Sequence, residues 1–342
     1  MLGGSWLTGA LHALAKEAGW DPGSADHIVG TSAGALIGSL VAAGIPPWFM
    51  VAHSAGETFE GLTGPDGRPA ADADRAGGAS FRLHRGVPPL GPGSLRMGLT
   101  ALRNPLGHTP LQILAGWLPS GVVSTEPIKD TVRRAVAGRW PPHPAFWAVA
   151  CDYRSGKRVP FGRLDVPATH VADAVAASCA IPGFFRPVEV AGRRYVDGGV
   201  CSASNADLLR GHGLDLVICL NPLSSRHRAG GIHPLDRFGD ATRAANGRRL
   251  GHELKKLRRH GTDVAVIEPT SEDIGTMGHN LMSAERRQLV IETAARTVAE
   301  RLREPELASK LAGLPQGEPH KIRRPDGPPS EWPPLQSMRR AA

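Results

Sequence analysis

Apolar residues follow two different spacings in the first part of the chain. In residues 5–18 they recur every three or four positions, which predicts a helix that ends before Gly19. Residues 26–30, "DHIVG", form a short apolar run that is typical of a buried strand. Residues 33–43, "AGALIGSLVAA", predict a buried helix that ends at Gly44. A strand, a tight turn and a helix therefore follow one another in this segment.

The rest of the chain continues this alternation of strand and helix patterns. Short apolar runs predict strands within residues 145–151, 157–161, 194–200, 214–220 and 263–267. Longer helical patterns cover residues 168–180 and 284–303. Because strands alternate with helices, we expect an α/β protein with a mainly parallel central sheet.

One long segment interrupts the alternation. Residues 56–94 are rich in Gly, Pro, Asp and Arg and show little periodicity, which predicts a long loop or an inserted segment. Two short amphipathic helices follow, the second beginning at Thr109. Their apolar faces carry Leu95, Leu99 and Leu102, and then Leu111, Leu114, Trp117 and Leu118. Residues 56–120 therefore fit a variable insertion, either a lid that contacts a membrane or a helical pair packed on the domain.

The net charge indicates which classes of partner the chain could bind. The 342 residues carry a net charge of +8, and the sequence pI is about 9.8, which permits attraction to phosphate-bearing lipids or nucleic acids. No zinc-finger or nucleic-acid-binding motif is present, so we expect no nucleic acid partner. The basic run 248–259 fits a solvated helix face or a contact with anionic headgroups. A peripheral contact with an anionic membrane therefore stays open, and the oligomeric state is unknown.

The cysteines and the apolar runs bear on the compartment. The four cysteines form no CxxC pair and lie in apolar settings, which favours reduced, buried thiols over disulfides or a zinc site. No window of about 20 residues is apolar enough to span a bilayer. The N-terminus lacks the basic and apolar regions of a signal peptide. We expect a cytoplasmic protein, with contact to a membrane only at its surface.

Ser32 is the first candidate for chemistry. It stands between Gly30 and Gly34 in "VGTSAGAL", where the predicted strand meets the predicted helix. A serine in a G-x-S-x-G turn is exposed on a sharp bend, and the free N–H groups of the following helix favour an oxyanion beside it. The alternative is an ordinary serine that caps the helix. Ser178 and Ser202 lack this glycine framing and are poorer candidates.

A serine nucleophile needs a base, and the sequence offers two kinds. A histidine after Asp197 would give the chain order Ser, acid, His of an α/β-hydrolase. An α/β-hydrolase normally has several strands before its nucleophile, and this chain has no room for them before Ser32. Asp197 itself stands in "YVDGGV", at the end of a predicted strand and before Gly198 and Gly199. Two glycines let another loop approach closely, and partial burial would raise the basicity of the carboxylate. The alternative is a simple D-G turn.

Taken together, three motifs point to one family. "GTSAGAL", "ASCAIPGFFRPV" at 177–188 and "YVDGGV" at 195–200, in this order, resemble the patatin-like phospholipase family over roughly residues 3–300. The resemblance implies a three-layer α/β/α fold, with Ser32 as nucleophile and Asp197 as proton acceptor. It implies hydrolysis of acyl esters of lipids through an acyl-enzyme intermediate, with a lipid or ester as substrate. It implies no cofactor and no metal, and the chain has no HExxH or EF-hand spacing.

The same resemblance assigns the residues around the dyad. The elbow and oxyanion residues are Gly3, Gly4, Gly30, Thr31, Ala33 and Gly34, and the dyad loop adds Gly198 and Gly199. The family has a glycine-rich oxyanion loop after its first strand, and here Gly3 matches the last glycine of that loop while Leu2 stands at its usual basic position. The first strand and the leading glycines are expected to be missing. Either the true start lies upstream, or the enzyme is impaired.

Two functions and one domain boundary follow from this comparison. The first function is an active serine acyl hydrolase of phospholipase A type. The second is a weak or inactive patatin-like protein that binds lipid or a partner. We expect one patatin-like domain over residues 1–304 and a Pro-rich, basic, disordered tail over 305–342.

Overall fold

A computed structural model describes most of the chain. The described residues are 2–56, 82–83, 91–103, 109–136, 138–227, 234–278, 280, 283 and 285–316. Most of the long segment that follows residue 56, and the C-terminal segment after residue 316, lie outside the described residues, so the expectations of a loop and of a disordered tail there remain predictions.

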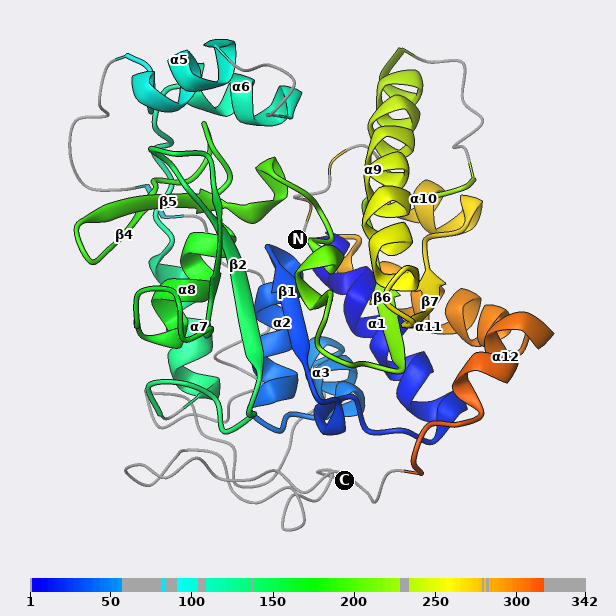
Figure 1. The fold of residues 1–342 in the computed structure, drawn as a ribbon. Helices are drawn as coiled ribbons and strands as arrows, with labels where there is room; N and C mark the ends of the chain where they lie inside the picture. Colours follow the sequence, from blue (N-terminus) through cyan, green and yellow to red (C-terminus); the bar gives the residue numbers. More distant parts are fainter. Residues whose placement is uncertain are drawn as a thin grey trace.

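Among the described residues, the strands form two sheets (Figure 1). The larger sheet contains β1 (Ile28–Thr31), β2 (Phe146–Asp152), β3 (Arg158–Phe161), β4 (Val188–Val190) and β5 (Arg193–Asp197). Its order is β1-β2-β5-β4, and β3 also pairs with β2. Strands β1 and β2 are parallel, whereas β2 pairs antiparallel with β3 and β5, and β4 with β5. The smaller sheet is a parallel pair of β6 (Leu216–Leu220) and β7 (Asp263–Ile267).

Helices connect and cover these strands. In the first half they are α1 (Leu2–Ala18), α2 (Ala33–Ala42), α3 (Pro47–Ser54), α5 (Leu95–Arg103), α6 (Pro110–Trp117), α7 (Glu126–Ala135) and α8 (Val171–Ser178). In the second half they are α9 (Pro234–Arg258), α10 (Ser271–Met277), α11 (Arg287–Leu302) and α12 (Pro305–Leu311). Strands β1, β2, β3, β5, β6 and β7 and helices α1, α2, α5, α6, α8 and α11 fall where the sequence pattern predicts them, within a few residues.

The alternation of side chains along the strands builds three layers. In β6, Val217 packs in a cluster with residues of α9, while its neighbour Ile218 packs on the cluster of α1 and α11. In β2, Ala148 faces α2, α7 and α8, whereas Trp147 joins the cluster of α9. Because successive strand residues point to opposite faces, both sheets are covered on both sides. The expected three-layer α/β/α class is confirmed, with α9 on one face and the other large helices on the opposite face (Figure 1).

The fold continues beyond the predicted domain boundary. Helix α12 begins at Pro305, and its Leu307 and Leu311 are buried in the same cluster as α1 and α11. The packed part of the described chain therefore extends at least to Leu311, past the boundary that the sequence predicts at residue 304. The Pro at residue 305 suggests a tail when the sequence is read alone. Pro is nevertheless well suited to the first turn of a helix, because N–H groups there have no acceptor within the helix and Pro loses no hydrogen bond.

The lengths of the apolar helices and the state of the cysteines can both be read from the structure. In the part of the chain that the structure describes, no single helix is long and apolar enough to cross a membrane. Helices α2 and α3 reach that length and composition together, but a bend of 119° separates them. All four cysteines are buried and free, as the sequence predicts.

Candidate active site

Ser32 lies on the turn between β1 and α2, in a backbone conformation that side chains rarely adopt. Its φ is 53° and its ψ is −122°, outside both the helical and the extended regions. It stands at the N-cap position of α2, but its hydroxyl makes no capping hydrogen bond. An ordinary cap serine would bond the N–H of the first turn. A strained backbone with a hydroxyl that does not cap the helix is typical of a nucleophile elbow.

The two glycines around Ser32 have different roles. A Cβ on Gly30 would lie 2.2 Å from the carbonyl oxygen of Gly34, so only glycine fits there. A Cβ on Gly34 would meet nothing within 4 Å. The sharp bend therefore requires Gly30, whereas Gly34 leaves open space beside the first turn of α2. The sequence pattern alone treats the two glycines as equivalent.

Side chains from the end of α8 hold the backbone of Ser32. The hydroxyl of Ser178 accepts a hydrogen bond of 2.9 Å from the Ser32 N–H and donates one of 2.6 Å to the carbonyl of Val149 in β2. The thiol of Cys179 donates to the Ser32 carbonyl over 3.2 Å. The two residues lie in the "SCAIPG" motif, but no local pattern shows that they reach Ser32. Their role is to fix the turn rather than to act as nucleophiles.

Asp197 is the last residue of β5 and faces the same end of the sheet. It pairs with Ala150 of β2, and its N–H donates to the carbonyl of Ala180 over 2.9 Å. A Cβ on the next residue, Gly198, would lie 2.3 Å from the Val149 carbonyl oxygen and 3.2 Å from the Thr31 methyl carbon. This glycine therefore lets the Asp197 loop approach the end of β2 and the Ser32 turn. The loop is more than a solvent-exposed D-G turn.

The carboxyl group of Asp197 is buried and is a stronger base than an ordinary aspartate. Burial raises its pKa to about 6, while interactions with the Ser32 hydroxyl and with the Gly199 N–H oppose this rise. The Gly199 N–H donates to Oδ1 of the carboxylate over 2.7 Å, which leaves Oδ2 for other contacts. Only 5% of the residue is exposed. A carboxylate in this setting holds a proton more readily than in water, as a general base must.

A second group of polar residues supports the elbow from the far side. Asn205, in a left-handed conformation with φ of 50°, donates from Nδ2 to the Thr31 hydroxyl over 3.0 Å. Two residues later, Asp207 is paired with Arg158 and Lys256. Burial alone would raise the pKa of Asp207, but these two cations lower it to about 2. The network is ionised at neutral pH and ties Thr31 to α9 through Asn205.

The predicted oxyanion glycines lie in the first turn of α1. A Cβ on Gly4 would be 3.5 Å from the Cβ of Ala33, and one on Gly3 would be 3.6 Å from the ring of Pro222. The N-terminal turns of α1 and α2 thus meet beside Ser32. The first N–H groups of a helix have no acceptor within that helix, so both turns can offer N–H donors there.

Histidines take other roles among the described residues. His27, His212 and Trp147 form an aromatic cluster with ring centroids 4.8 to 5.3 Å apart. The groups that shift the pKa of Asp197 are Ser32 and Gly199, and no histidine is among them. A Ser–acid–His triad, as in an α/β-hydrolase, therefore receives no support at this site.

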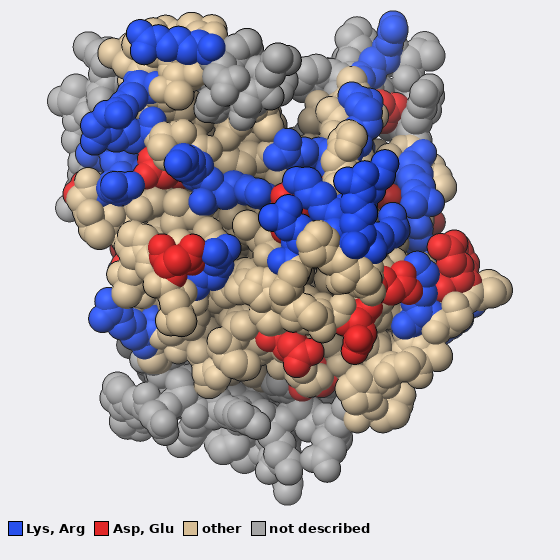
Figure 2. Space-filling model, in the orientation of Figure 1, with Lys and Arg blue, Asp and Glu red and all other residues tan. Residues whose placement is uncertain are grey.

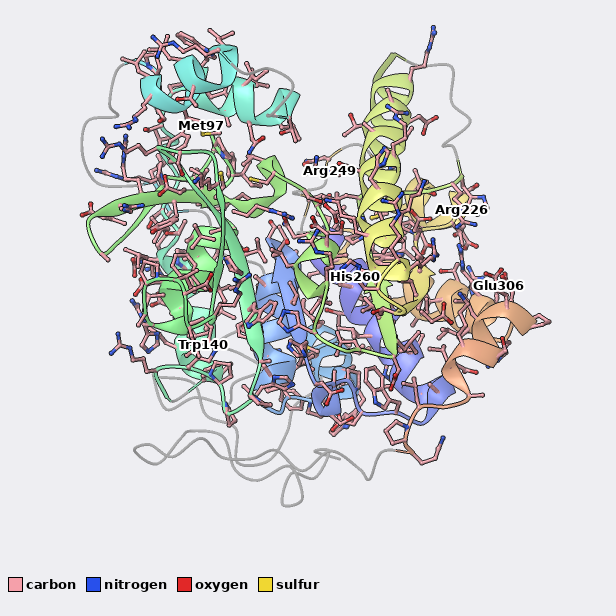
Figure 3. The ribbon with its side chains drawn as sticks, in the orientation of Figure 1. Met97, Trp140, Arg226, Arg249, His260 and Glu306 are labelled. Atoms are coloured by element: carbon pink, nitrogen blue, oxygen red, sulfur yellow. The ribbon has the colours of Figure 1, made fainter. Side chains whose placement is uncertain are left out.

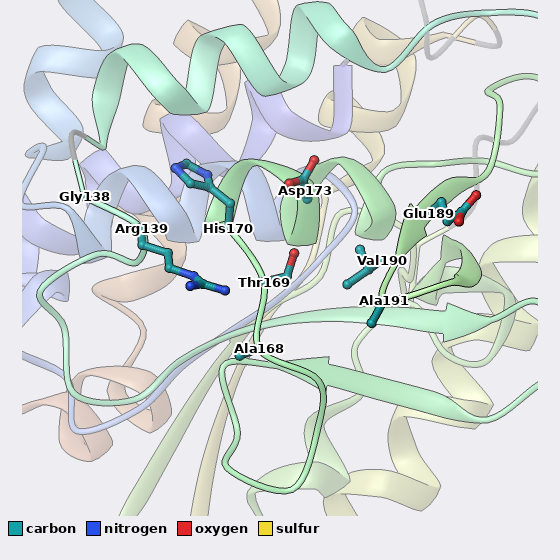
Figure 4. A pocket seen from close by; sticks show the side chains of 9 residues that line it. All are labelled: Gly138, Arg139, Ala168, Thr169, His170, Asp173, Glu189, Val190 and Ala191. Atoms are coloured by element: carbon teal, nitrogen blue, oxygen red, sulfur yellow. The ribbon is translucent and has the colours of Figure 1, made fainter.

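A separate hollow lies at the opposite end of α8 from Ser178 (Figure 4). It has a volume of about 670 Å³ and is lined by Gly138, Arg139, Ala168, Thr169, His170, Asp173, Glu189, Val190 and Ala191. His170 caps α8 by accepting from the Ala172 N–H, and Asp173 pairs with Lys129. These side chains serve the local structure, and none belongs to the sequence-predicted site. Within the described ranges, no group of three or more His, Cys, Asp or Glu residues could hold a metal.

Comparison with known proteins identifies a family for the greater part of the chain. The family described as patatin-like phospholipase matches residues 1–210. Uncharacterized NTE family proteins of Mycobacterium bovis and of two strains of Mycobacterium tuberculosis are each 37% identical to the chain over 105 residues. The matched segment covers 30% of this chain and 28% of each relative. The similarity thus spans just over a quarter of the length of these relatives.

Proposed function

Because the chain belongs to the patatin-like phospholipase family, whose members are lipid acyl hydrolases, we propose that it cleaves fatty-acyl esters through a dyad of Ser32 and Asp197. The observation that carries this proposal is the pairing of a strained serine with a buried carboxylate whose pKa is raised to about 6. Substrates of this chemistry are phospholipids, lysophospholipids and simple esters. In phospholipase A chemistry of this kind the alcohol, a lysophospholipid where the substrate is a phospholipid, leaves first and the fatty acid leaves second.

In the first step, Asp197 accepts the proton of the Ser32 hydroxyl. The Ser32 oxygen attacks the ester carbonyl carbon, and the electron pair of the C=O bond moves to the oxygen. Collapse of this tetrahedral intermediate breaks the bond to the alcohol, which leaves with the proton that Asp197 held. The acyl group remains on Ser32 as an ester.

The developing oxyanion needs N–H donors next to Ser32. We assign this role to the N–H groups of Ala33 and Gly34 in α2, with Gly3 and Gly4 of α1 on the opposite side. Helix N-termini stabilise negative charge because the peptide dipoles and the free N–H groups point toward it. Loss of one such donor typically lowers turnover by about 10²- to 10³-fold.

In the second step, water replaces the alcohol. Asp197 takes a proton from the water molecule, the hydroxide oxygen attacks the acyl carbon, and the bond to Ser32 breaks. The Ser32 oxygen recovers a proton from Asp197 and the fatty acid leaves. A carboxylate with a pKa near 6 suits both directions of transfer, since it accepts a proton at neutral pH and releases it readily.

Covalent labelling with a fluorophosphonate probe tests the nucleophile. We expect one adduct by intact mass on the wild-type chain, none on Ser32→Ala, and full labelling of Ser309→Ala, whose serine is exposed on α12. Hydrolysis of a soluble short-chain p-nitrophenyl ester by the same three proteins should follow the same order. An adduct that persists on Ser32→Ala would overturn the assignment.

A further inference from the structure

The outer faces of α5 and α6 form one exposed apolar patch. Six large apolar side chains on these helices are 40% to 55% exposed, namely Leu95, Leu99, Leu102, Leu111, Leu114 and Trp117. Residues three or four apart share a face of a helix, so each set of three lies on one side of its helix. The opposite sides of both helices face inward, because Met97 of α5 and Gln112 of α6 are buried. The five leucines therefore face away from the buried side of the pair, and Trp117 is exposed at its edge. Together they are more than the scattered exposed leucines of an ordinary surface.

Close packing makes the two helices a single unit, the α5–α6 pair. A Cβ on Gly116 would lie 2.5 Å from the backbone nitrogen of Gly98, so the helices touch at these glycines. A Cβ on Gly98 would lie 3.0 Å from the ring of Trp117, which places Trp117 against α5. The Ser94 N–H also donates to the Gly116 carbonyl over 3.1 Å. The patch is thus held by backbone contact and keeps its shape.

The patch is surrounded by positive charge. The sequence contains no Asp or Glu from Arg75 to Thr125. Arg96 and Arg103 are exposed on α5 itself. Figure 2 shows basic side chains over α5 and a band of them beneath the α5–α6 pair that reaches α9. Exposed leucines with arginines and without acids fit the boundary between acyl chains and anionic headgroups.

The inner side of the α5–α6 pair is fixed to the loop that follows Asp197. The Thr109 hydroxyl donates to the Val200 carbonyl over 2.5 Å, and the Gln112 side-chain amide donates to the Gly156 carbonyl over 2.8 Å. Met97, labelled in Figure 3 beneath α5, packs in one cluster with Val196 and Val200 on either side of Asp197. A surface that docks on the outer face of the pair would therefore contact helices that pack directly against Val196 and Val200, on either side of the proposed base.

Charge decides between the possible occupants of the patch. A second copy of the chain in a two-fold dimer would bring the same surface against itself, so Arg96 and Arg103 would face their own counterparts. Like charges across an interface oppose association. An anionic bilayer offers both an apolar interior for the leucines and negative headgroups for the arginines, and Trp is favoured at that boundary.

We propose that the α5–α6 pair is a docking surface for an anionic lipid bilayer, which brings the dyad to its lipid substrate. The consequence for catalysis rests on the proposed function, whereas docking itself needs no turnover. Leu95, Leu99, Leu102, Leu111, Leu114 and Trp117 enter the headgroup boundary, and the basic side chains around them contact the headgroups.

Co-sedimentation of the full chain with vesicles tests docking without chemistry. All proteins carry Ser32→Ala, so hydrolysis does not alter the vesicles. The probes are vesicles of phosphatidylcholine with and without phosphatidylglycerol. The test variant is Leu99→Asp with Leu114→Asp, and the matched control is Leu164→Asp with Leu289→Asp, since those two leucines are also exposed but lie outside the pair. Thermal unfolding of each variant establishes that it is folded.

We expect the parent protein to sediment with phosphatidylglycerol vesicles and only weakly with phosphatidylcholine alone. Binding should fall about tenfold or more in the test variant, since each buried leucine contributes strongly to partition, and should stay unchanged in the control. Raising the salt from about 0.1 M to 1 M should also weaken it, because the Debye length falls from about 10 Å to 3 Å.

Three outcomes would overturn the docking surface: no vesicle binding, equal loss in the test and control variants, or a dimer in gel filtration that the test variant alone dissociates. The last result would assign the patch to a second copy. Hydrolysis of the soluble ester by the wild-type chain reports on the proposed function separately. Ester cleavage without vesicle binding would contradict only the docking proposal. Vesicle binding without ester cleavage would contradict only the proposed dyad.

Discussion

At the scale of single residues, the site depends on a conflict between stability and chemistry. Ser32 is held at a φ of 53°, which costs free energy, and Asp197 is a carboxylate in a buried position. Neither arrangement helps the protein fold. Ser178 and Cys179 hold the Ser32 backbone through contacts that the rest of α8 positions. The structure therefore maintains a strained serine and a buried carboxylate, each at a cost in free energy, which is typical of functional sites.

Asp197→Asn should abolish ester hydrolysis and raise stability. The folded-state pKa of about 6 lies above the ordinary value of 3.8. A raised pKa means that the protonated carboxyl favours the folded state. This contribution to the free energy of unfolding is fully present below about pH 4 and is lost as the pH rises through about 6. The amide cannot ionise, so at pH 8 the variant should gain up to about 3 kcal/mol in the free energy of unfolding, at about 1.4 kcal/mol per pKa unit. Urea unfolding at pH 4 and pH 8 measures this, and a variant that is less stable at pH 8 would contradict it.

The pH profile of hydrolysis follows from the same group. Asp197 must be ionised to accept the Ser32 proton, and burial raises its pKa to about 6. We expect kcat/KM for a soluble ester to be flat above pH 7 and to fall about tenfold per pH unit below about pH 6. A base with the ordinary pKa of an exposed aspartate would keep its activity down to about pH 4, and that profile would contradict the prediction.

Ser178→Ala tests whether the nucleophile needs its backbone held. The change leaves the Ser32 N–H and the Val149 carbonyl without their partner. We expect kcat to fall about 10- to 100-fold with KM nearly unchanged, because a small misplacement of a nucleophile is costly. Ser39→Ala is the matched control, since Ser39 is also buried but bonds only the Leu36 carbonyl within α2. Equal kinetic effects of the two variants would argue against a positioning role.

At the scale of elements, the turn between β1 and α2 is set by one glycine and by the approach of a distant loop. The carbonyl of Gly34 occupies the space where a side chain at residue 30 would lie. The end of β5 reaches the same place because Gly198 permits contact with Val149 and Thr31. A strand-turn-helix pattern predicts the bend, and the pairing of β2 with β5 decides which carboxylate meets it.

Gly30→Ala and Gly34→Ala should therefore differ in stability. The added methyl at residue 30 would lie 2.2 Å from a carbonyl oxygen, so the turn must open and we expect a loss of more than about 3 kcal/mol. The methyl at residue 34 enters open space, and Ala favours a helix, so stability should stay the same or rise by up to about 1 kcal/mol. Chemical unfolding of the two variants checks this, and equal losses would show that the turn treats the glycines alike.

At the scale of the whole molecule, α1 connects the two ends of the described chain. Its residues pack in one cluster with α11 and α12, and a Cβ on Gly9 would lie 2.3 Å from the Ile291 carbonyl oxygen. The same helix brings its first turn to Ala33 beside Ser32. Residues beyond the family match at 1–210 thus take part in the packing that places the site.

Removing apolar contacts of α12 should destabilise the whole fold. Leu307 and Leu311 are buried in the cluster that contains α1. We expect Leu307→Ala and Leu311→Ala each to lower the free energy of unfolding by about 2–5 kcal/mol, through lost burial and the cavity left behind. Leu289→Ala, at an exposed position of α11, should change it by less than about 0.5 kcal/mol. If α12 variants unfolded like this control, the helix would not belong to the core.

The sequence by itself determined the features that depend on near neighbours. Periodic apolar residues predict the α/β class, and the motifs around Ser32 and Asp197 predict the family, because spacing and glycine framing are local. Tertiary structure alone decided that Ser178 holds Ser32 across 146 residues of chain, that Gly30 but not Gly34 is sterically required, and that α12 belongs to the core. It also decided the raised pKa of Asp197, since burial is a property of everything packed around a residue. Contacts between distant segments leave no local pattern, because many side chains could satisfy them equally well.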